Sequence, residues 1–282
     1  MDIYDKLLPP TTYQGGKQRL SKVIIDYILE NEGEQIATFY DLCCGSGAVG
    51  LEMISRGIPS IMVDKGLYGA VWNSIGNKEF NIDIFKEEVD KLPEIEGIKD
   101  YLYNLSLKPV DKERMVYHYL LLQAGSFGGK QIWVEGDKWC NNSFRSYWKP
   151  TATSNRRSVV NPMMPMPNTI IERLEVILKY QDYITGFNKD IVDFSNEIMD
   201  EGKQIFYIDP PYRSTTGYKD NFDLDFVVER LRQYGTVYVS EGYKMEKSSN
   251  SIELSKGRAK GNISGNRKKE PVKEILNIFN KK

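Results

Sequence analysis

A strand, a glycine-rich turn, a helix and a second strand follow one another near the start of this chain. The apolar runs 36–40 and 61–63 predict two buried strands, and residues 48–56 between them predict a helix. Gly45-x-Gly47-x-x-Gly50 joins the first strand to the helix, and Asp64 ends the second strand. A strand, a helix and a strand within about 30 residues indicate a parallel βαβ unit, which commits the chain to an α/β fold.

The glycine-rich turn also predicts a nucleotide-like cofactor. Glycines let the backbone approach a ligand closely, and a carboxylate at Asp64 can hold a ribose diol. Taken alone, this pattern fits NAD, FAD or S-adenosylmethionine. Asp41, at the end of the first strand, would repel a pyrophosphate but suits the cationic amino-acid end of S-adenosylmethionine. The turn therefore favours a methyltransferase over a dehydrogenase.

The spacing of apolar residues predicts further elements along the chain. Helices are expected over 20–31, 117–123 and 169–180, and strands over 183–187, 205–208 and 236–240. Between residues 80 and 167, aromatic, glycine, asparagine and basic residues mix without a βα alternation. We therefore predict a doubly wound, Rossmann-like α/β sheet formed by 1–75 and 169–282, with an inserted module over 76–168.

The motif Asp209-Pro210-Pro211-Tyr212 carries the most specific chemistry. It follows the apolar strand 205–208, so it lies at the carboxyl edge of the sheet, where ligands bind in doubly wound folds. The exocyclic amine of a purine is a poor nucleophile, and acceptors aimed at its N–H groups localise its lone pair for attack on a methylsulfonium. Asp209 and the Pro210 carbonyl are such acceptors, the prolines stiffen the turn, and Tyr212 offers a flat face for the base. This chemistry requires no metal and no covalent nucleophile.

The composition is that of a globular protein of a reducing cytoplasm. Of 282 residues, 40% are hydrophobic and 27% are charged, and no apolar run reaches the roughly 20 residues of a membrane span. The chain begins with acidic residues where a secretory signal would carry basic ones. Three cysteines, of which Cys43 and Cys44 are adjacent, argue against a disulfide framework. The single histidine, His118, is expected to be structural.

The formal net charge of −1 hides an uneven distribution of basic residues. The stretch 256–269 contains six basic residues and no acid. It is either a solvated loop or a segment that contacts phosphates, whose neutralisation is the largest sequence-independent contribution to DNA affinity. The DNA contacts predicted in it are Lys256, Arg258, Arg267 and Lys268.

Three motifs together resemble those of the Dam-type adenine-N6 DNA methyltransferases. They are Tyr13-Gln14-Gly15-Gly16-Lys17, Asp41-Leu42-Cys43-Cys44-Gly45-Ser46-Gly47 and Asp209-Pro210-Pro211-Tyr212. Their order is that of the α group of this class, in which the target recognition domain lies between the cofactor and catalytic halves. Residues 66–72 and 239–243 are similar to phage members. The resemblance covers 11–75 and 183–245, is looser over 270–280, and is only generic over 80–167.

The resemblance implies S-adenosyl-L-methionine as the methyl donor and N6 of an adenine flipped out of duplex DNA as the acceptor. It places residues 13–17 against the methionine moiety and Asp190 at the cofactor adenine, with Asp193 as a competitor. The cofactor contacts expected from it are Tyr13, Gln14, Gly15, Gly16, Lys17, Asp41, Leu42, Cys43, Gly45, Ser46, Gly47, Asp64, Lys65, Asp190, Ile191 and Asp209. Cys43-Cys44 and Lys65 depart from the common family pattern, so cofactor contacts there are expected to differ.

If the family order holds, the inserted module is a target recognition domain that reads the DNA sequence. Arginine pairs with guanine, and asparagine or glutamine pairs with adenine, in the major groove. The contacts expected in the module are Lys130, Asn141, Asn142, Arg145, Arg156 and Arg157, whereas Phe127 and Trp133 are expected in a small core. The target sequence, the oligomeric state and a partner restriction endonuclease stay open, as does the choice between a restriction-modification system and an orphan phage enzyme.

Other functions remain open from the sequence alone. RNA adenine and protein glutamine methyltransferases use related Pro-Pro motifs, but usually with asparagine in place of Asp209 and without the Gly-Gly-Lys placement. A catalytically silent DNA-binding relative would keep the fold, but the intact motif at 209–212 argues against decay. A dehydrogenase is disfavoured by Asp41 and by the lack of an evident hydride-transfer site.

Overall fold

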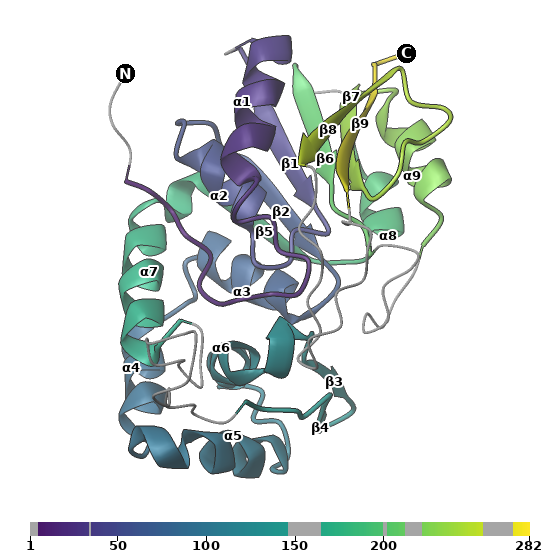
Figure 1. The fold of residues 1–282 in the computed structure, drawn as a ribbon. Coiled ribbons are helices and arrows are strands. Elements are labelled where there is room, and N and C mark those ends of the chain that lie inside the picture. Colours follow the sequence, from purple (N-terminus) through teal and green to yellow (C-terminus); the bar gives the residue numbers. More distant parts are fainter. Residues whose placement is uncertain (1–4, 34, 146–164, 200–201, 212–221, 256–272) are drawn as a thin grey trace, which may run out of the picture.

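A mixed seven-stranded sheet organises the chain (Figure 1). The computed structural model describes residues 5–33, 35–145, 165–199, 202–211, 222–255 and 273–282. The strands of the sheet are β1 (Thr38–Leu42), β2 (Ser60–Asp64), β5 (Ile184–Asn188), β6 (Gln204–Ile208), β7 (Gly235–Glu241), β8 (Asn250–Ser255) and β9 (Glu274–Phe279). Their order across the sheet is β5-β2-β1-β6-β7-β9-β8. The first five strands in this order are parallel to one another, and β9 pairs antiparallel with both β7 and β8.

Both faces of the central strands are buried, which explains why they read as continuous apolar runs in the sequence. In β6, Ile205 and Tyr207 belong to one buried cluster, whereas Phe206 and Ile208 belong to the cluster on the other face. The helices α1 (Ser21–Glu32), α2 (Ala48–Ile54) and α3 (Leu67–Gly76) supply side chains to the first face. The helices α8 (Ile191–Ser195) and α9 (Leu224–Leu231) supply the second. The sheet is therefore the middle layer of three.

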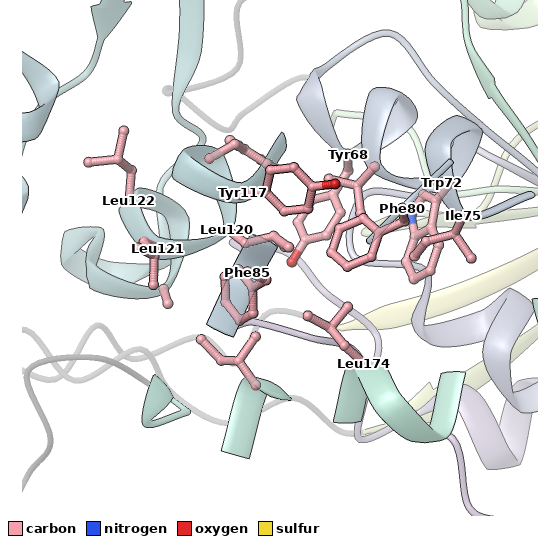
Figure 2. Close-up of a cluster of buried hydrophobic side chains, with 14 of the residues drawn as sticks. Tyr68, Trp72, Ile75, Phe80, Phe85, Tyr117, Leu120, Leu121, Leu122 and Leu174 are labelled. Atoms are coloured by element: carbon pink, nitrogen blue, oxygen red, sulfur yellow. The ribbon is translucent and has the colours of Figure 1, made fainter. Parts of the chain in front are cut away.

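The chain between β2 and β5 adds a helical region beyond α3 (Figure 1). Its elements are α4 (Ile82–Asp90), η1 (Ile95–Gly97), α5 (Ile98–Ser106), α6 (Met115–Gly125), η2 (Phe127–Gly129), the hairpin of β3 (Trp133–Glu135) and β4 (Lys138–Cys140), α7 (Pro167–Lys179) and η3 (Gln181–Tyr183). Figure 2 shows Tyr68 and Trp72 of α3 in one buried cluster with Tyr117 and Leu120 of α6. This region thus shares its hydrophobic core with α3 and the adjoining face of the sheet.

Gly47 fixes the turn that carries the chain from β1 into α2. Its φ is +74°, and an ideal Cβ at this position would lie 2.2 Å from Met62 Cε and 2.6 Å from Trp72 Cζ2. The indole Nε1 of Trp72 donates to the carbonyl oxygen of Gly45 at 2.9 Å. Only a residue without a side chain lets the turn lie this close to β2 and α3.

The fold class predicted from the sequence is confirmed, together with each strand and helix that was placed in the sheet region. The boundaries moved by a few residues, as for the first strand, which runs over Thr38–Leu42 rather than 36–40. The boundaries of an inserted domain over 76–168 stay a prediction. The expectation that Phe127 is a core residue is wrong: its side chain is 44% exposed at the start of the short η2 turn, where Gly128 and Gly129 both have positive φ.

Three further expectations can be compared with direct observations. All three cysteines are free. In the part of the chain that the structure describes, no helix is both long and apolar enough to cross a membrane. The His118 Nε2 lies 3.2 Å from the Glu88 Oε2 on α4, which ties the imidazole to a buried carboxylate between two helices.

Replacing Gly47 with alanine should destabilise the fold by about 3 kcal/mol or more, because strain at positive φ adds to overpacking against Met62 and Trp72. Gly128→Ala is the matched control, since Gly128 has a similar left-handed backbone (φ +71°, ψ 11°) but an added Cβ would meet nothing within 4 Å. This control should lose only about 1–2 kcal/mol. Urea unfolding measures both free energies, and equal losses would contradict the packing constraint.

Candidate active site

The site lies where the sheet changes direction, between β1 and β6. The chain leaves β1 toward β2 and β5 on one side, and it leaves β6 toward β7 on the other. The loops beyond these two strands therefore diverge and leave a crevice at their carboxyl ends, which is where ligands bind in open α/β sheets. The backbone N–H of Asp209 donates to the Leu42 carbonyl at 3.2 Å, so the two loops begin side by side.

A pocket of about 680 Å³, its open mouth included, occupies this crevice. Its lining residues are Tyr13, Cys43, Val63, Asp64, Lys65, Gly66, Gln131, Lys189, Asp190, Ile191, Asp209, Pro211 and Phe222. Segments far apart in the chain, predicted separately from the sequence, thus meet around one cavity.

Lys17 connects the N-terminal segment to Asp209. Its Nζ lies 2.6 Å from Asp209 Oδ1 and 3.7 Å from Glu274 Oε1 of β9, and it donates to the Gly15 carbonyl at 3.0 Å. The lysine is 6% exposed. Burial lowers the pKa of Lys17, but the neighbouring carboxylates of Asp209 and Glu274 outweigh it and hold this pKa above the ordinary value. The ammonium is therefore a permanent cation beside Asp209.

Burial dominates the acidity of Asp209. It raises the pKa of this carboxyl to about 6, against the opposing charge and hydrogen bond of Lys17, and the charge of Glu274 adds to the rise. The carboxylate is thus ionised at neutral pH but poised close to protonation. One of its oxygens accepts from Lys17, which leaves the other as an acceptor toward the pocket.

Asp64 is fixed in the pocket by two backbone donors. Gly45 N–H donates to its Oδ2 at 2.8 Å, and Gly66 N–H donates to its Oδ1 at 2.7 Å. Burial raises the pKa of Asp64, and these two hydrogen bonds oppose the rise. Asn188, at the end of β5, also donates to the carbonyls of 64–66, so the backbone beside the carboxylate is held as well. Each carboxylate oxygen keeps a lone pair for a ligand.

Asp190 lies at the other end of the pocket, where it caps α8. Its Oδ1 accepts from Val192 N–H at 2.8 Å, and Lys65 Nζ lies 3.1 Å from its Oδ2. Burial would raise the pKa of Asp190, but the Val192 N–H and Lys65 lower it below the ordinary value. Of the two acids that competed for the adenine position, Asp190 lines the pocket together with Ile191.

The structure places Asp41 beneath the glycine-rich turn. It is 1% exposed, and its Oδ2 accepts from Gly50 N–H at 2.7 Å in the first turn of α2. Burial raises its pKa to about 8, although the Gly50 hydrogen bond opposes the rise. In this position Asp41 holds the turn in place from below, and a direct contact with a cofactor stays a prediction.

The remaining residues of the N-terminal motif pack around the same turn. The Tyr13 ring lies against Gly45, where an added Cβ would be 2.8 Å from the ring. Gly16 N–H donates to the Tyr13 carbonyl at 3.1 Å, and an added Cβ on Gly16 would lie 3.6 Å from Ser46 Oγ. Gln14 N–H donates to the carbonyl of Gly129 at 2.8 Å, which ties the motif to the chain beyond α6.

A family model described as D12 class N6 adenine-specific DNA methyltransferase matches residues 13–275. The chain belongs to this family. It is therefore an enzyme that methylates adenine in DNA, which decides against the dehydrogenase and favours DNA over RNA or protein as the substrate. A comparison with curated proteins finds no match.

The predicted DNA contacts of this methyltransferase occupy different settings. Lys130 is exposed. Asn141 donates from Nδ2 to the Gln131 carbonyl at 2.7 Å, Asn142 donates to the Trp139 carbonyl at 3.0 Å, and Arg145 donates to the Ser126 carbonyl at 2.7 Å. Tyr212, Arg156, Arg157, Lys256, Arg258, Arg267 and Lys268 lie outside the described residues. A role in DNA binding stays a prediction for all of them.

Sequence reasoning missed three residues of the site. Glu274 lies on β9, which pairs antiparallel with β7, and no local sequence pattern predicted this pairing. Gln131 and Phe222 line the pocket from segments that carry no motif. No motif marked Glu274 or Phe222 as a site residue, although Glu274 lies in 270–280, where the family resemblance is looser. Gln131 follows two glycines and precedes an apolar run, so it was at least a candidate.

The fall of the methylation rate at acidic pH (the acid limb of its pH profile) should reflect protonation of Asp209. The sequence predicts that an ionised Asp209 accepts from the target amine, so kcat/KM for DNA should fall as the pH drops below about 6, the pKa of this carboxyl. Lys17→Met removes the cation that lowers this pKa, so the limb should move to higher pH. Lys22→Met is the control, because Lys22 is an exposed lysine paired with Asp26. A limb that stays in place in the Lys17 variant would remove Lys17 from this role.

Proposed function

We infer that this enzyme transfers a methyl group from S-adenosyl-L-methionine to N6 of an adenine that is turned out of duplex DNA, at a specific target sequence. The observation that carries the inference is the buried contact between Lys17 and Asp209 at a pocket that also contains Asp64 and Asp190. A hydrogen-bond acceptor, a cation that holds it and two anchored carboxylates meet around one cavity. The family supports the type of reaction, and these residues are the groups that we propose carry it out.

The donor set of the pocket fits S-adenosylmethionine. Asp64 offers two fixed acceptor oxygens for a ribose diol, and Asp190 offers an acceptor beside the apolar Ile191, which suits an adenine ring. Tyr13 and Cys43 line the part of the pocket nearest the glycine-rich turn, where the methionine moiety would lie. When bound, the cofactor supplies an electrophilic methyl group on sulfur.

Asp209 and the Pro210 carbonyl act on the target amine. The lone pair of an exocyclic amine is delocalised into the purine ring, and acceptors for both N–H groups favour the geometry in which it is localised on nitrogen. Asp209 is directed by Lys17, and Pro210 has no N–H of its own to compete for an acceptor. Because these groups are fixed before the base arrives, their effect requires no reorganisation during the reaction.

The adenine must leave the helix to reach this crevice. Flipping a base costs a few kcal/mol, which contacts elsewhere on the DNA have to offset. We assign those contacts to the chain between β2 and β5, as the target recognition domain, and to the basic stretch 256–269. We place the enzyme in the cytoplasm of a bacterial cell or a phage-infected host, where DNA is accessible, alone or beside a cognate endonuclease.

Asp209→Asn should separate chemistry from cofactor binding. The amide leaves the shape of the site intact but loses the charge, so methyl transfer should fall by roughly 10²–10³-fold. Binding of S-adenosylhomocysteine should stay close to that of the wild type. Asp64→Asn should show the reverse pattern, with weakened binding, and Asp193→Asn should change neither quantity.

Transfer of a tritiated methyl group to duplex DNA, with RNA and protein in parallel, gives the rate and the substrate class. Isothermal titration gives the affinity for S-adenosylhomocysteine. Wild-type label found only in RNA or protein would overturn the proposed function, and full activity of the Asp209 variant would remove Asp209 from the mechanism.

The basic stretch 256–269 should contribute to DNA affinity through phosphate contacts. Replacing Lys256, Arg258, Arg267 and Lys268 with glutamate should weaken binding of non-specific duplex DNA and flatten the dependence of log K on log salt. Each lost phosphate contact should reduce the slope by about 0.9. Fluorescence anisotropy over a salt series measures this slope. An unchanged slope would contradict phosphate contacts and favour a solvated loop.

A further inference from the structure

Gln131 is a polar side chain buried at the pocket and unused by the mechanism above. It lies between η2 and β3, it is 9% exposed, and it lines the cavity with Asp64 and Gly66. Its side-chain amide has no hydrogen-bond partner among the described residues. The amide still reaches solvent through the pocket, so a ligand that pairs with it replaces water and gains about 0.5–1.5 kcal/mol net.

The backbone on both sides of Gln131 is held rigidly by Gln123 of α6. Gln123 is fully buried; its Nε2 donates to the carbonyls of Gly129 and Lys130 at 3.1 and 3.2 Å, and its Oε1 accepts from Ile132 N–H at 3.1 Å. Asn141 donates to the Gln131 carbonyl itself at 2.7 Å. The main chain that carries Gln131 is therefore fixed, and its side chain lines the cavity from this fixed point.

The side-chain amide of Gln131 and the carboxylate of Asp64 lie close together beside Gly66. An ideal Cβ on Gly66 would lie 2.7 Å from Gln131 Nε2 and 2.9 Å from Asp64 Oδ1, so both groups converge on one position. An ionised carboxylate only accepts hydrogen bonds, whereas an amide also donates two. A vicinal diol donates from its hydroxyls to Asp64 and still has oxygen lone pairs that need donors. Gln131 supplies the donor that Asp64 lacks.

We propose that Gln131 is a cofactor-binding residue, which donates from Nε2 to a sugar hydroxyl of the nucleoside that Asp64 holds. The inference rests on S-adenosylmethionine as the cofactor of the proposed function. It adds that the chain between β2 and β5, expected only to read DNA, also completes the cofactor site. The glycine at position 66 is required for this, because any side chain there would displace the amide.

The test measures the affinity for S-adenosylhomocysteine and for its 2′-deoxy and 3′-deoxy analogues by isothermal titration. Gln131→Met keeps the length of the side chain but removes its donors, and affinity for S-adenosylhomocysteine should fall roughly 3- to 10-fold. Gln131→Glu places a second carboxylate beside Asp64 and should weaken binding further. Gln233→Met is the control, since Gln233 is an exposed glutamine near the end of α9.

The deoxy analogues distinguish a sugar contact from a structural effect. Removing the sugar hydroxyl that Gln131 contacts should weaken binding to the wild type. Removing the same hydroxyl should change binding to Gln131→Met very little, because this variant already lacks the partner of that hydroxyl. Equal losses for both proteins on both analogues, or wild-type affinity of the variant, would overturn the inference and leave the proposed function standing. A wild-type protein that binds no S-adenosylhomocysteine would overturn both. Thermal unfolding of the two variants checks that each is folded.

Discussion

β1 and β6 run parallel at the centre of the sheet, and just beyond their paired ends the Asp209 N–H donates to the Leu42 carbonyl. This pairing brings the glycine-rich turn and the Asp-Pro-Pro turn to the same edge although they are far apart in the chain. A shift of register by one residue would exchange the side chains between the two faces of the sheet. Both faces are buried in separate clusters, so the close fit of side chains in each cluster disfavours such a shift, and the register in turn positions the site.

The second constraint is electrostatic. Lys17, Asp209 and Glu274 come from the N-terminal segment, the turn after β6, and β9, and their side chains are 6%, 19% and 13% exposed. Burying charges is unfavourable unless they are paired, so each of the three holds the others in place. The outcome is an acceptor with a raised pKa, fixed beside a cation, at the end of a rigid strand. Such a group is directed before substrate binds, which is the condition for electrostatic catalysis.

Local patterns predicted the elements that are formed by neighbouring residues. The βαβ unit, α7 and the strand before Asp209 could be read from apolar spacing, and the Asp209 motif was placed at the sheet edge because parallel strands end there. The antiparallel strands β8 and β9 could not be predicted from local patterns, since β9 pairs with β7 and β8 pairs with β9, which joins segments distant in sequence. Glu274 was missed for this reason. Gln123 was missed because glutamine in an apolar helix carries no signal of the carbonyls that it binds.

The chain between β2 and β5 is joined to the catalytic half by more than its two ends. The cluster around Trp72 continues through Tyr117 and Leu120 to Leu174, so α3 packs on both the sheet and this region (Figure 2). Gln14 and Gln123 then tie the motif that carries Lys17 to the segment that carries Gln131. The pocket wall that carries Gln131 and the segment that carries Lys17 are therefore parts of one hydrogen-bonded unit. Because this unit packs on α3 through the shared core, the fold holds both sides of the pocket in one arrangement.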